Sequence, residues 1–349
     1  MRWISFVFVA VAWLLAAAPA RAATSLEKHG CAACHSVDGS PGRGPTLRGI
    51  AGAKRWVIEA GTRVEVEAHR AYLARSIVTP DAEIVEGYAA GSMPAFNLAA
   101  PEVDALVAEM EGLRAGGPPP APGSIALLVL STAAFVGLHI LLASMPVRRR
   151  LVARLGDGGF QGIYSLISLA CLIAMIFGFR SAPYIALWSA PGVLRWIPNV
   201  VMPIASIVFL CSVTTRSPTL AGKPGEPPTT EAIGIIRVTR HPMLWASLLW
   251  GLAHIPPNGE LRALVLFGSL AALSIVGMIH IDARRERLFP DAWAKIAATT
   301  SVLPFAAIAA GRNRFVFREI GVVRVVFGLA VWAALLHLHK LVFGLSPLP

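Results

Sequence analysis

The stretch Cys31-Ala32-Ala33-Cys34-His35 decides the fold of the N-terminal part of this chain. A C-x-x-C-H pentapeptide is typical of covalent attachment of a c-type haem, in which two thiols bond the porphyrin and the histidine ligates the iron. C-x-x-C pairs also form redox dithiols and half zinc sites, but neither needs the adjoining histidine. Met93 offers a thioether as second axial ligand, which raises the reduction potential. The sequence therefore predicts one haem c with His35 and Met93 on the iron.

The composition places most of the chain in a membrane. Of its 349 residues, 55% are apolar and 15% are charged, and the mean hydropathy is +0.63, which excludes an ordinary soluble protein. The formal net charge of +11 would suggest nucleic-acid binding in a soluble protein. Here the arginines gather between apolar stretches, as in loops on the inner side of a membrane, so we expect no nucleic-acid partner.

The region around the pentapeptide resembles a class I cytochrome c, in the form appended to cytochrome-oxidase subunits. The resemblance covers about residues 24–114 and is carried by Gly44-Pro45-Thr46-Leu47, residues 72–77 and 84–88, and Met93-Pro94-Ala95-Phe96. It implies that the Pro45 carbonyl bonds to and orients the ligand histidine, His35. It also implies an all-α domain. The apolar spacing of residues 102–110 matches the last helix of that family, which packs on the first.

Two segments flank this domain. Residues 1–23 predict a signal peptide, because Arg2 precedes an apolar run and Ala20-Arg21-Ala22 forms an A-x-A cleavage signature. An uncleaved membrane anchor is the alternative. In either case the haem domain is exported, and we expect it in the periplasm of a bacterium. Residues 115–123 are rich in proline and glycine and predict an extended, semi-rigid linker.

Residues 124–349 predict a polytopic bundle of about six transmembrane helices. Apolar stretches occur at about 124–145, 162–180, 196–214, 243–256, 261–281 and 321–343, and a span needs about 20 residues. The fourth stretch is short and must extend into its flanks or tilt. Basic residues such as Arg148, Arg149 and Arg150 concentrate in alternate connecting segments, which predicts that both chain ends lie outside. We therefore expect a multi-pass protein of the bacterial inner membrane.

Histidines are unusually frequent in this membrane part, at His139, His241, His254, His280, His337 and His339. Ionisable side chains inside a bilayer are costly and point to function, although each could instead be a neutral imidazole bonded between helices. Together they favour a b-type haem held by two histidines from facing helices. His139 with His254 is the preferred pair, whereas His254 with His337 agrees better in membrane depth.

The membrane part is similar to the NnrU family, which includes denitrification-linked bacterial proteins and the plastid zeta-carotene isomerase. The similarity spans about residues 124–345 and is carried by Gly137-Leu138-His139, residues 237–242, residues 249–254 and Asp282-Ala283-Arg284-Arg285. In the isomerase branch, a first-helix histidine and one thirteen residues after the R-H-P histidine ligate haem b. The similarity thus implies His139 and His254 as ligands, because His254 follows His241 by thirteen residues.

The turn Arg240-His241-Pro242 also resembles membrane methyltransferases, in which this region helps to hold S-adenosylmethionine. The acidic and glycine pattern expected for that cofactor is missing from the sequence. His241 and His280 could form a polar site with Arg240 and Asp282 near the inner face. The alternative is that these side chains anchor helix ends at the membrane interface.

Three functions are consistent with these features. The first is electron transfer from a periplasmic donor through haem c to haem b, a step that fusion makes intramolecular. The second is a haem-b isomerase of a polyunsaturated lipid such as a carotenoid, active only when its iron is reduced. The third is a non-catalytic accessory or sensor role in nitrite and nitric oxide respiration. The expected partners are a periplasmic electron donor or acceptor and membrane lipid, and the sequence leaves enzymatic activity and oligomeric state open.

Overall fold

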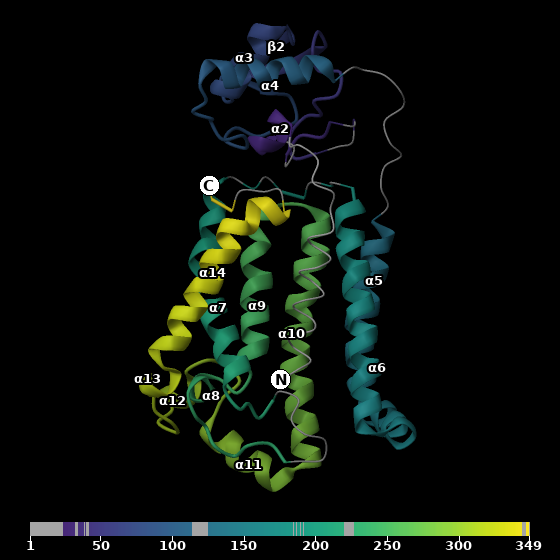
Figure 1. Cartoon of the computed structure of the whole chain (residues 1–349), viewed down its shortest axis with the longest axis vertical. Coiled ribbons are helices and arrows are strands. Elements are labelled where there is room, and N and C mark those ends of the chain that lie inside the picture. Colours follow the sequence, from purple (N-terminus) through teal and green to yellow (C-terminus); the bar gives the residue numbers. More distant parts are fainter. Residues whose placement is uncertain are drawn as a thin grey trace. The chain divides into compact units, whose positions relative to one another are not determined.

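The computed structural model describes residues 24–31, 34–37, 39, 42–113, 125–183, 185, 187–188, 190, 192–219, 227–343 and 347–348. The chain divides into two compact units, with the main boundary between residues 120 and 121, and Figure 1 shows the elements of each. The predicted signal peptide, residues 1–23, and the predicted linker, residues 115–123, lie outside the described residues.

The helical part of the first unit consists of α2 (Ser25–Lys28), α3 (Arg70–Val78) and α4 (Ala100–Gly112). The Glu102 side chain accepts a hydrogen bond from the Ala99 amide at 2.9 Å, which caps the start of α4. The buried residues of α4 recur at helical spacing, at Val103, Leu106, Val107 and Met110. This stripe packs on α2 and α3, so the last helix contacts the first, as predicted.

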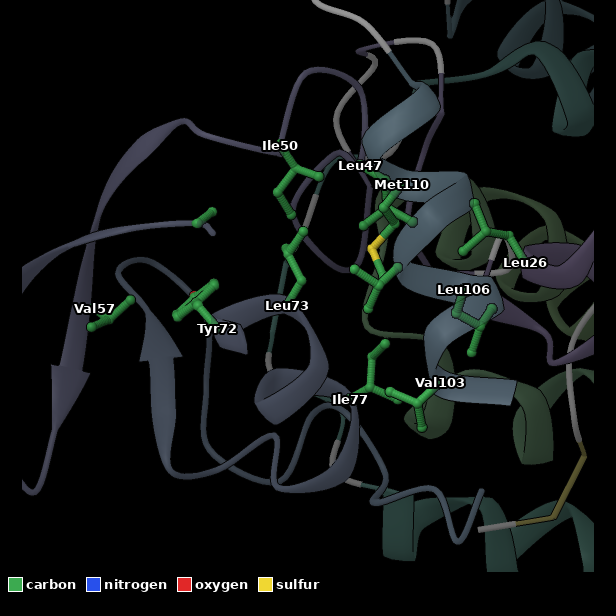
Figure 2. Close-up of a cluster of buried hydrophobic side chains, with 12 residues drawn as sticks. Leu26, Leu47, Ile50, Val57, Tyr72, Leu73, Ile77, Val103, Leu106 and Met110 are labelled. Carbon is green, nitrogen blue, oxygen red and sulfur yellow. The ribbon is translucent and has the colours of Figure 1, made fainter. Parts of the chain in front are cut away.

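The core of the first unit also holds the segment that follows the C-x-x-C-H motif. Figure 2 shows Leu26 of α2, Leu73 of α3 and Leu106 of α4 in this core, and each of these side chains is at most 1% exposed. Leu47 and Ile50, only a few residues beyond the motif, belong to the same cluster. The motif is therefore anchored by apolar burial on its C-terminal side as well as by α2 on its N-terminal side.

A small antiparallel sheet completes the first unit and is a feature that the sequence analysis did not anticipate. Its strand order is β2-β1-β3, with β1 at Lys54–Glu59, β2 at Thr62–Glu67 and β3 at Glu83–Val85. Ala60 and Gly61 join β1 to β2 and have φ angles of 47° and 82°, as in the two-residue turns that favour hairpins. The sheet is a minor addition, and the predominantly helical class that was predicted is confirmed.

The second unit is a bundle of long helices. They are α5 (Ala126–Ala143), α6 (Met145–Ser181), α7 (Trp196–Thr214), α9 (Pro242–His254), α10 (Leu261–Leu288) and α14 (Val322–Phe343), which starts in this unit. α10 packs against α5, α6 and α9, and α9 also packs against α7. The short helices α8 (Ile235–Val238), α11 (Pro290–Thr299), α12 (Ala306–Ala309) and α13 (Phe317–Ile320) lie together at one end of the bundle (Figure 1).

Glycines let the helices of this bundle approach one another closely. A Cβ atom on Gly178 of α6 would lie 2.8 Å from the backbone of Leu128 in α5, and one on Gly328 of α14 would lie 2.7 Å from Cα of Ile207 in α7. Such contacts are typical of helices packed in lipid, where association depends on close van der Waals packing.

Five helices in the described part of the chain are long and apolar enough to cross a membrane, within Ala126–Ala143, Met145–Ser181, Val193–Thr214, Leu261–Leu288 and Val322–His339. This count is slightly lower than the expected number of about six, and the predicted class of a polytopic helical bundle is confirmed. The fourth predicted stretch, 243–256, forms α9, whose 13 residues extend about 20 Å against a hydrocarbon core of about 30 Å. The chain is compatible with a multi-pass membrane protein.

Irregular backbone closes the C-terminal end of α9. After the 3-10 turn at Pro256–Asn258, the Gly259 carbonyl accepts a hydrogen bond from Leu187 N at 2.8 Å, and Leu261 N donates to the Ile185 carbonyl at 2.9 Å. Trp188 Nε1 donates to the Pro256 carbonyl at 3.1 Å. Gly259 is required here, because its φ is 38° and a Cβ would lie 2.4 Å from the Trp188 carbonyl oxygen.

Candidate functional site

The C-x-x-C-H motif forms a tight turn directly after α2. The amide of Cys34 donates to the Cys31 carbonyl at 3.1 Å, and the amide of His35 donates to the same carbonyl at 2.9 Å. The two cysteines and the histidine are therefore presented by one short loop of backbone, and Cys31 also packs on the apolar core. Two thiols and an imidazole held this closely are what covalent haem attachment requires.

The imidazole of His35 is held by the backbone of the next segment. Its Nδ1 lies 2.7 Å from the Pro45 carbonyl oxygen, so Nδ1–H donates and Nε2 keeps the lone pair that could ligate iron. Burial lowers the pKa of His35, opposed by the Pro45 hydrogen bond and assisted by the nearby positive charge of Arg55. The imidazole is therefore neutral at neutral pH, as a metal ligand must be.

Gly44 makes room for this imidazole. A Cβ atom at that position would lie 2.4 Å from Cε1 and 2.6 Å from Nδ1 of His35. The amide of Gly44 donates to the Cys34 carbonyl at 2.9 Å, which ties the histidine-supporting segment back to the motif. The ring is thus confined by the backbone at Gly44, which approaches its Nδ1–Cε1–Nε2 edge.

Met93 lies in the irregular segment between β3 and α4, where its side chain is half-buried. The segment is anchored at Gly91, whose amide donates to Asp81 Oδ1 at 2.8 Å. Among the residues that the structure describes, none of the recorded contacts joins Met93 directly to His35. Axial ligands on opposite faces of a haem do not touch each other, so the two positions are chemically compatible with one iron.

Arg55 is a candidate site residue that the sequence reasoning missed. Its Nε is buried and has no hydrogen-bond partner within the described residues, while its charge acts on His35, Tyr72 and Tyr88. A buried, unpaired guanidinium nitrogen beside the iron ligand is the partner that a haem propionate carboxylate would satisfy. A lone arginine in a strand carries no local motif, so only its position in the fold reveals it.

The membrane histidines His139 and His254 have the same local geometry. His139 Nδ1 lies 2.8 Å from the Phe135 carbonyl, and His254 Nδ1 lies 2.8 Å from the Trp250 carbonyl. Each carbonyl is one helical turn earlier, so Nδ1–H donates and Nε2 is the nitrogen with the lone pair.

Each of these histidines is also flanked by aromatic rings. The ring of His139 lies 4.2 Å from Phe135 and 5.2 Å from Tyr164 of α6. His254 stacks on Phe267 of α10 at 5.1 Å. The described ring contacts of His139 are with α5 and α6, and those of His254 are with α9 and α10.

His241, Arg240 and Asp282 form one polar cluster, as the sequence suggested. His241 Nε2 lies 2.6 Å from Asp282 Oδ1, and Arg240 Nε donates to Asp282 Oδ2 at 2.9 Å. The His241 side chain is fully buried, and its Nδ1 has no partner among the described residues. His280 is not part of the cluster, because its Nε2 donates to the Ala143 carbonyl of α5 at 3.1 Å.

Comparison with known proteins agrees with both resemblances. Residues 127–347 match the family described as NnrU protein, and residues 19–113 match the family described as Cytochrome c. The 15-cis-zeta-carotene isomerase of Arabidopsis thaliana chloroplasts is 30% identical over 187 residues, which cover 51% of this chain and 49% of the plant protein. The Zea mays isomerase is 26% identical over 195 residues, covering 54% and 52%. The chain spans about half the length of these curated relatives.

Proposed function

This chain belongs to the NnrU family, and we propose that it is a membrane haem protein whose cytochrome c unit exchanges electrons with the NnrU bundle. The observation that carries the proposal is the setting of His35, a half-buried imidazole that is fixed through Nδ1 by the Pro45 carbonyl at 2.7 Å and follows Cys34 directly. Haem c bound to Cys31 and Cys34 supplies a reversible one-electron couple. The Pro45 carbonyl and the close approach of Gly44 set the orientation of the proximal ligand.

We further propose that His139 and His254 hold a haem b in the bundle. The support is their shared tautomer: in both, Nδ1–H donates a hydrogen bond to a carbonyl of the same helix, which leaves the Nε2 lone pair free to coordinate. Phe135, Tyr164 and Phe267 add apolar aromatic rings around these imidazoles, which suits the neighbourhood of a macrocycle. His337 is a weaker candidate, because its side chain is exposed on α14.

A second candidate function is isomerisation of a polyunsaturated lipid. It is favoured by the relatives in Arabidopsis thaliana and Zea mays, both named 15-cis-zeta-carotene isomerase. In this version the cytochrome c unit would control the redox state of the iron in the bundle. Turnover of a cis-polyene by the purified, reduced protein would favour it over pure electron transfer.

For the cellular setting, we propose the inner membrane of a bacterium, with the cytochrome c unit in the periplasm. The support is the arginine asymmetry of the segments between the apolar helices. A reporter fused after Arg150 should then behave as cytoplasmic, and a periplasmic signal from that fusion would contradict this orientation.

The test of the two-haem proposal is a redox-resolved absorption spectrum of the purified full chain, combined with acid-acetone extraction. Haem c stays with the protein in acid acetone because it is covalently bound, whereas haem b is extracted. We expect one non-extractable and one extractable haem per chain. Two independent redox transitions should appear in a titration. A protein with only the non-extractable haem would refute the haem b proposal and leave the cytochrome c proposal standing.

A further inference from the structure

A depression of about 330 Å³ lies at the end of the bundle that carries the short helices. Its lining includes Arg240, Ala297, Val302, Leu303, Ala306 and Arg312. These residues come from the turn before α9, from α11 and from the segment around α12. The depression is therefore built from parts of the chain that are far apart in sequence and meet only in the folded bundle.

The two arginines of this depression differ in how their charges are balanced. Arg240 is paired with Asp282, with Nε and Nη2 at 2.9 and 2.8 Å from Oδ2. Arg312 instead donates from Nη1 to the carbonyls of Ala297, Ala298 and Thr300 at 3.0–3.1 Å. In the described ranges, no carboxylate lies within ion-pair distance of Arg312. The wall thus offers one rigidly held, uncompensated positive charge.

Apart from the two arginines and the hydroxyl residues Thr300 and Ser301, the lining of the depression is apolar. This apolar lining continues into exposed hydrophobic side chains. Leu303, which lines it, is 62% exposed, and the neighbouring Phe305 and Phe315 are 53% and 49% exposed. The rings of Phe305 and Phe315 lie 6.2 Å apart. A small inorganic anion would leave this apolar surface in water, whereas an amphipathic anion would cover it.

Phe305 is held in an unfavourable backbone conformation, which adds a second and independent observation. Its φ is +64°, a region in which a bulky residue is a strained outlier. The Phe305 amide donates to the Val238 carbonyl at 2.9 Å, so contacts with the adjacent α8 maintain this conformation. The strain turns an aromatic side chain outward beside the depression instead of into the core.

We propose that this depression binds an anionic phospholipid, with the phosphodiester on Arg312 and Arg240 and the start of an acyl chain along Leu303 and Phe305. The charge matches, because one phosphodiester carries one negative charge and the wall offers one uncompensated positive charge. The depth also matches, because these residues follow the end of the spanning helix α10 at Leu288, where arginine and aromatic side chains meet lipid headgroups.

The test titrates delipidated full-length protein in nonionic detergent with phosphatidylglycerol or phosphatidylcholine and measures bound lipid by native mass spectrometry. Phosphatidylglycerol should bind at least about tenfold more tightly. Arg312→Gln should weaken it about tenfold, as expected for one lost charge-assisted bond. Arg318→Gln is the control, since it removes an exposed arginine outside the depression.

Leu303→Glu is the second variant, because this exposed side chain can change without disturbing the carbonyl bonds of Arg312. It should weaken phosphatidylglycerol binding at least as much as Arg312→Gln does. Equal affinity for the two lipids would overturn the proposal. So would an equal loss in Arg318→Gln, which would indicate general surface attraction. Displacement of the lipid by equimolar inorganic phosphate would show a headgroup-only anion site and overturn it as well.

Discussion

The two units of this protein build their histidine sites in opposite ways. In the cytochrome c unit, His35, its supporting carbonyl at Pro45 and the glycine that makes room for it lie within eleven residues, 35–45. In the NnrU bundle, His254 meets Phe267 across two helices, and His241 finds Asp282 forty-one residues later. A locally encoded site can be identified from a short motif, whereas a site assembled by helix packing depends on the whole fold.

The largest expected effect is the loss of covalent haem at the C-x-x-C-H motif, whose residues are adjacent in sequence. Replacing both Cys31→Ala and Cys34→Ala should abolish covalent haem completely, because no thiol remains to bond the porphyrin. Peroxidase staining of a denaturing gel measures this. Cys171→Ala, in α6, should keep the full signal. A stained band in the double variant would contradict the attachment of haem through Cys31 and Cys34.

Substitutions at the proposed haem b ligands should remove nearly as much haem, although these residues are distant in sequence. His254→Ala should remove almost all acid-acetone-extractable haem, and His139→Ala should remove it or convert it to a high-spin form, because one imidazole ligand is lost. His337→Ala is the matched control on an exposed position and should leave the haem content unchanged. Loss of haem in His337→Ala alone would show that the cofactor is right and the ligand pair wrong.

Substitution of Met93 tests whether the haem c site takes its second axial ligand from a residue outside the C-x-x-C-H segment. Met93→Ala should remove the weak near-infrared sulfur-to-iron band of the ferric protein and lower the reduction potential, since a thioether favours ferrous iron. Covalent haem should be retained. An unchanged band and potential would assign the sixth position to another residue.

Gly44→Ala should cost about 1–3 kcal/mol of stability in the cytochrome c unit, because the new methyl group must displace the His35 ring. The measurement is the loss of the haem absorption band on heating. Gly112→Ala is the control, since a Cβ there meets nothing within 4 Å. Its stability should be unchanged or slightly raised. Equal effects in the two variants would mean that the ring is not confined by Gly44.

The smallest effect concerns an ion pair between segments of the bundle that are 82 residues apart. Hydrogen bonds from Arg237 and from the Gly234 amide lower the pKa of Glu319 below its ordinary value. A carboxyl with a lowered folded-state pKa stabilises the fold above the ordinary value of 4.5, and this contribution disappears as pH falls through the lowered value.

Arg237→Gln should therefore reduce stability by about 1 kcal/mol at pH 6 and by less at pH 3. Thermal unfolding at the two pH values measures the difference. Glu231→Gln, on an exposed side chain, should lower stability equally little at both. A loss of stability in Arg237→Gln that is the same at both pH values would contradict the link between this ion pair and the pKa of Glu319.

The sequence predicted features that depend on short segments better than features that depend on contacts between distant segments. The haem motif, the helical class and the pairing of Arg240 with Asp282 rest on short patterns or family motifs. The sheet was missed although Ala60-Gly61 between alternating strands is a hairpin signal. Arg55 was missed because its burial depends on strands and loops packing around it. The number of helices long enough to span is slightly lower than expected, because apolar composition does not reveal that α9 ends at His254.

Because α9 is short, protein backbone surrounds the end of the helix at its last residue, His254. Hydrocarbon offers no hydrogen-bond partner, so the irregular backbone after His254 must be satisfied by protein, and Ile185, Leu187 and Trp188 do this. Polar backbone and amide dipoles therefore replace acyl chains over that end of the helix. A charge that moved between His254 and that end of the helix would therefore pass hydrogen-bonded protein backbone instead of acyl chains.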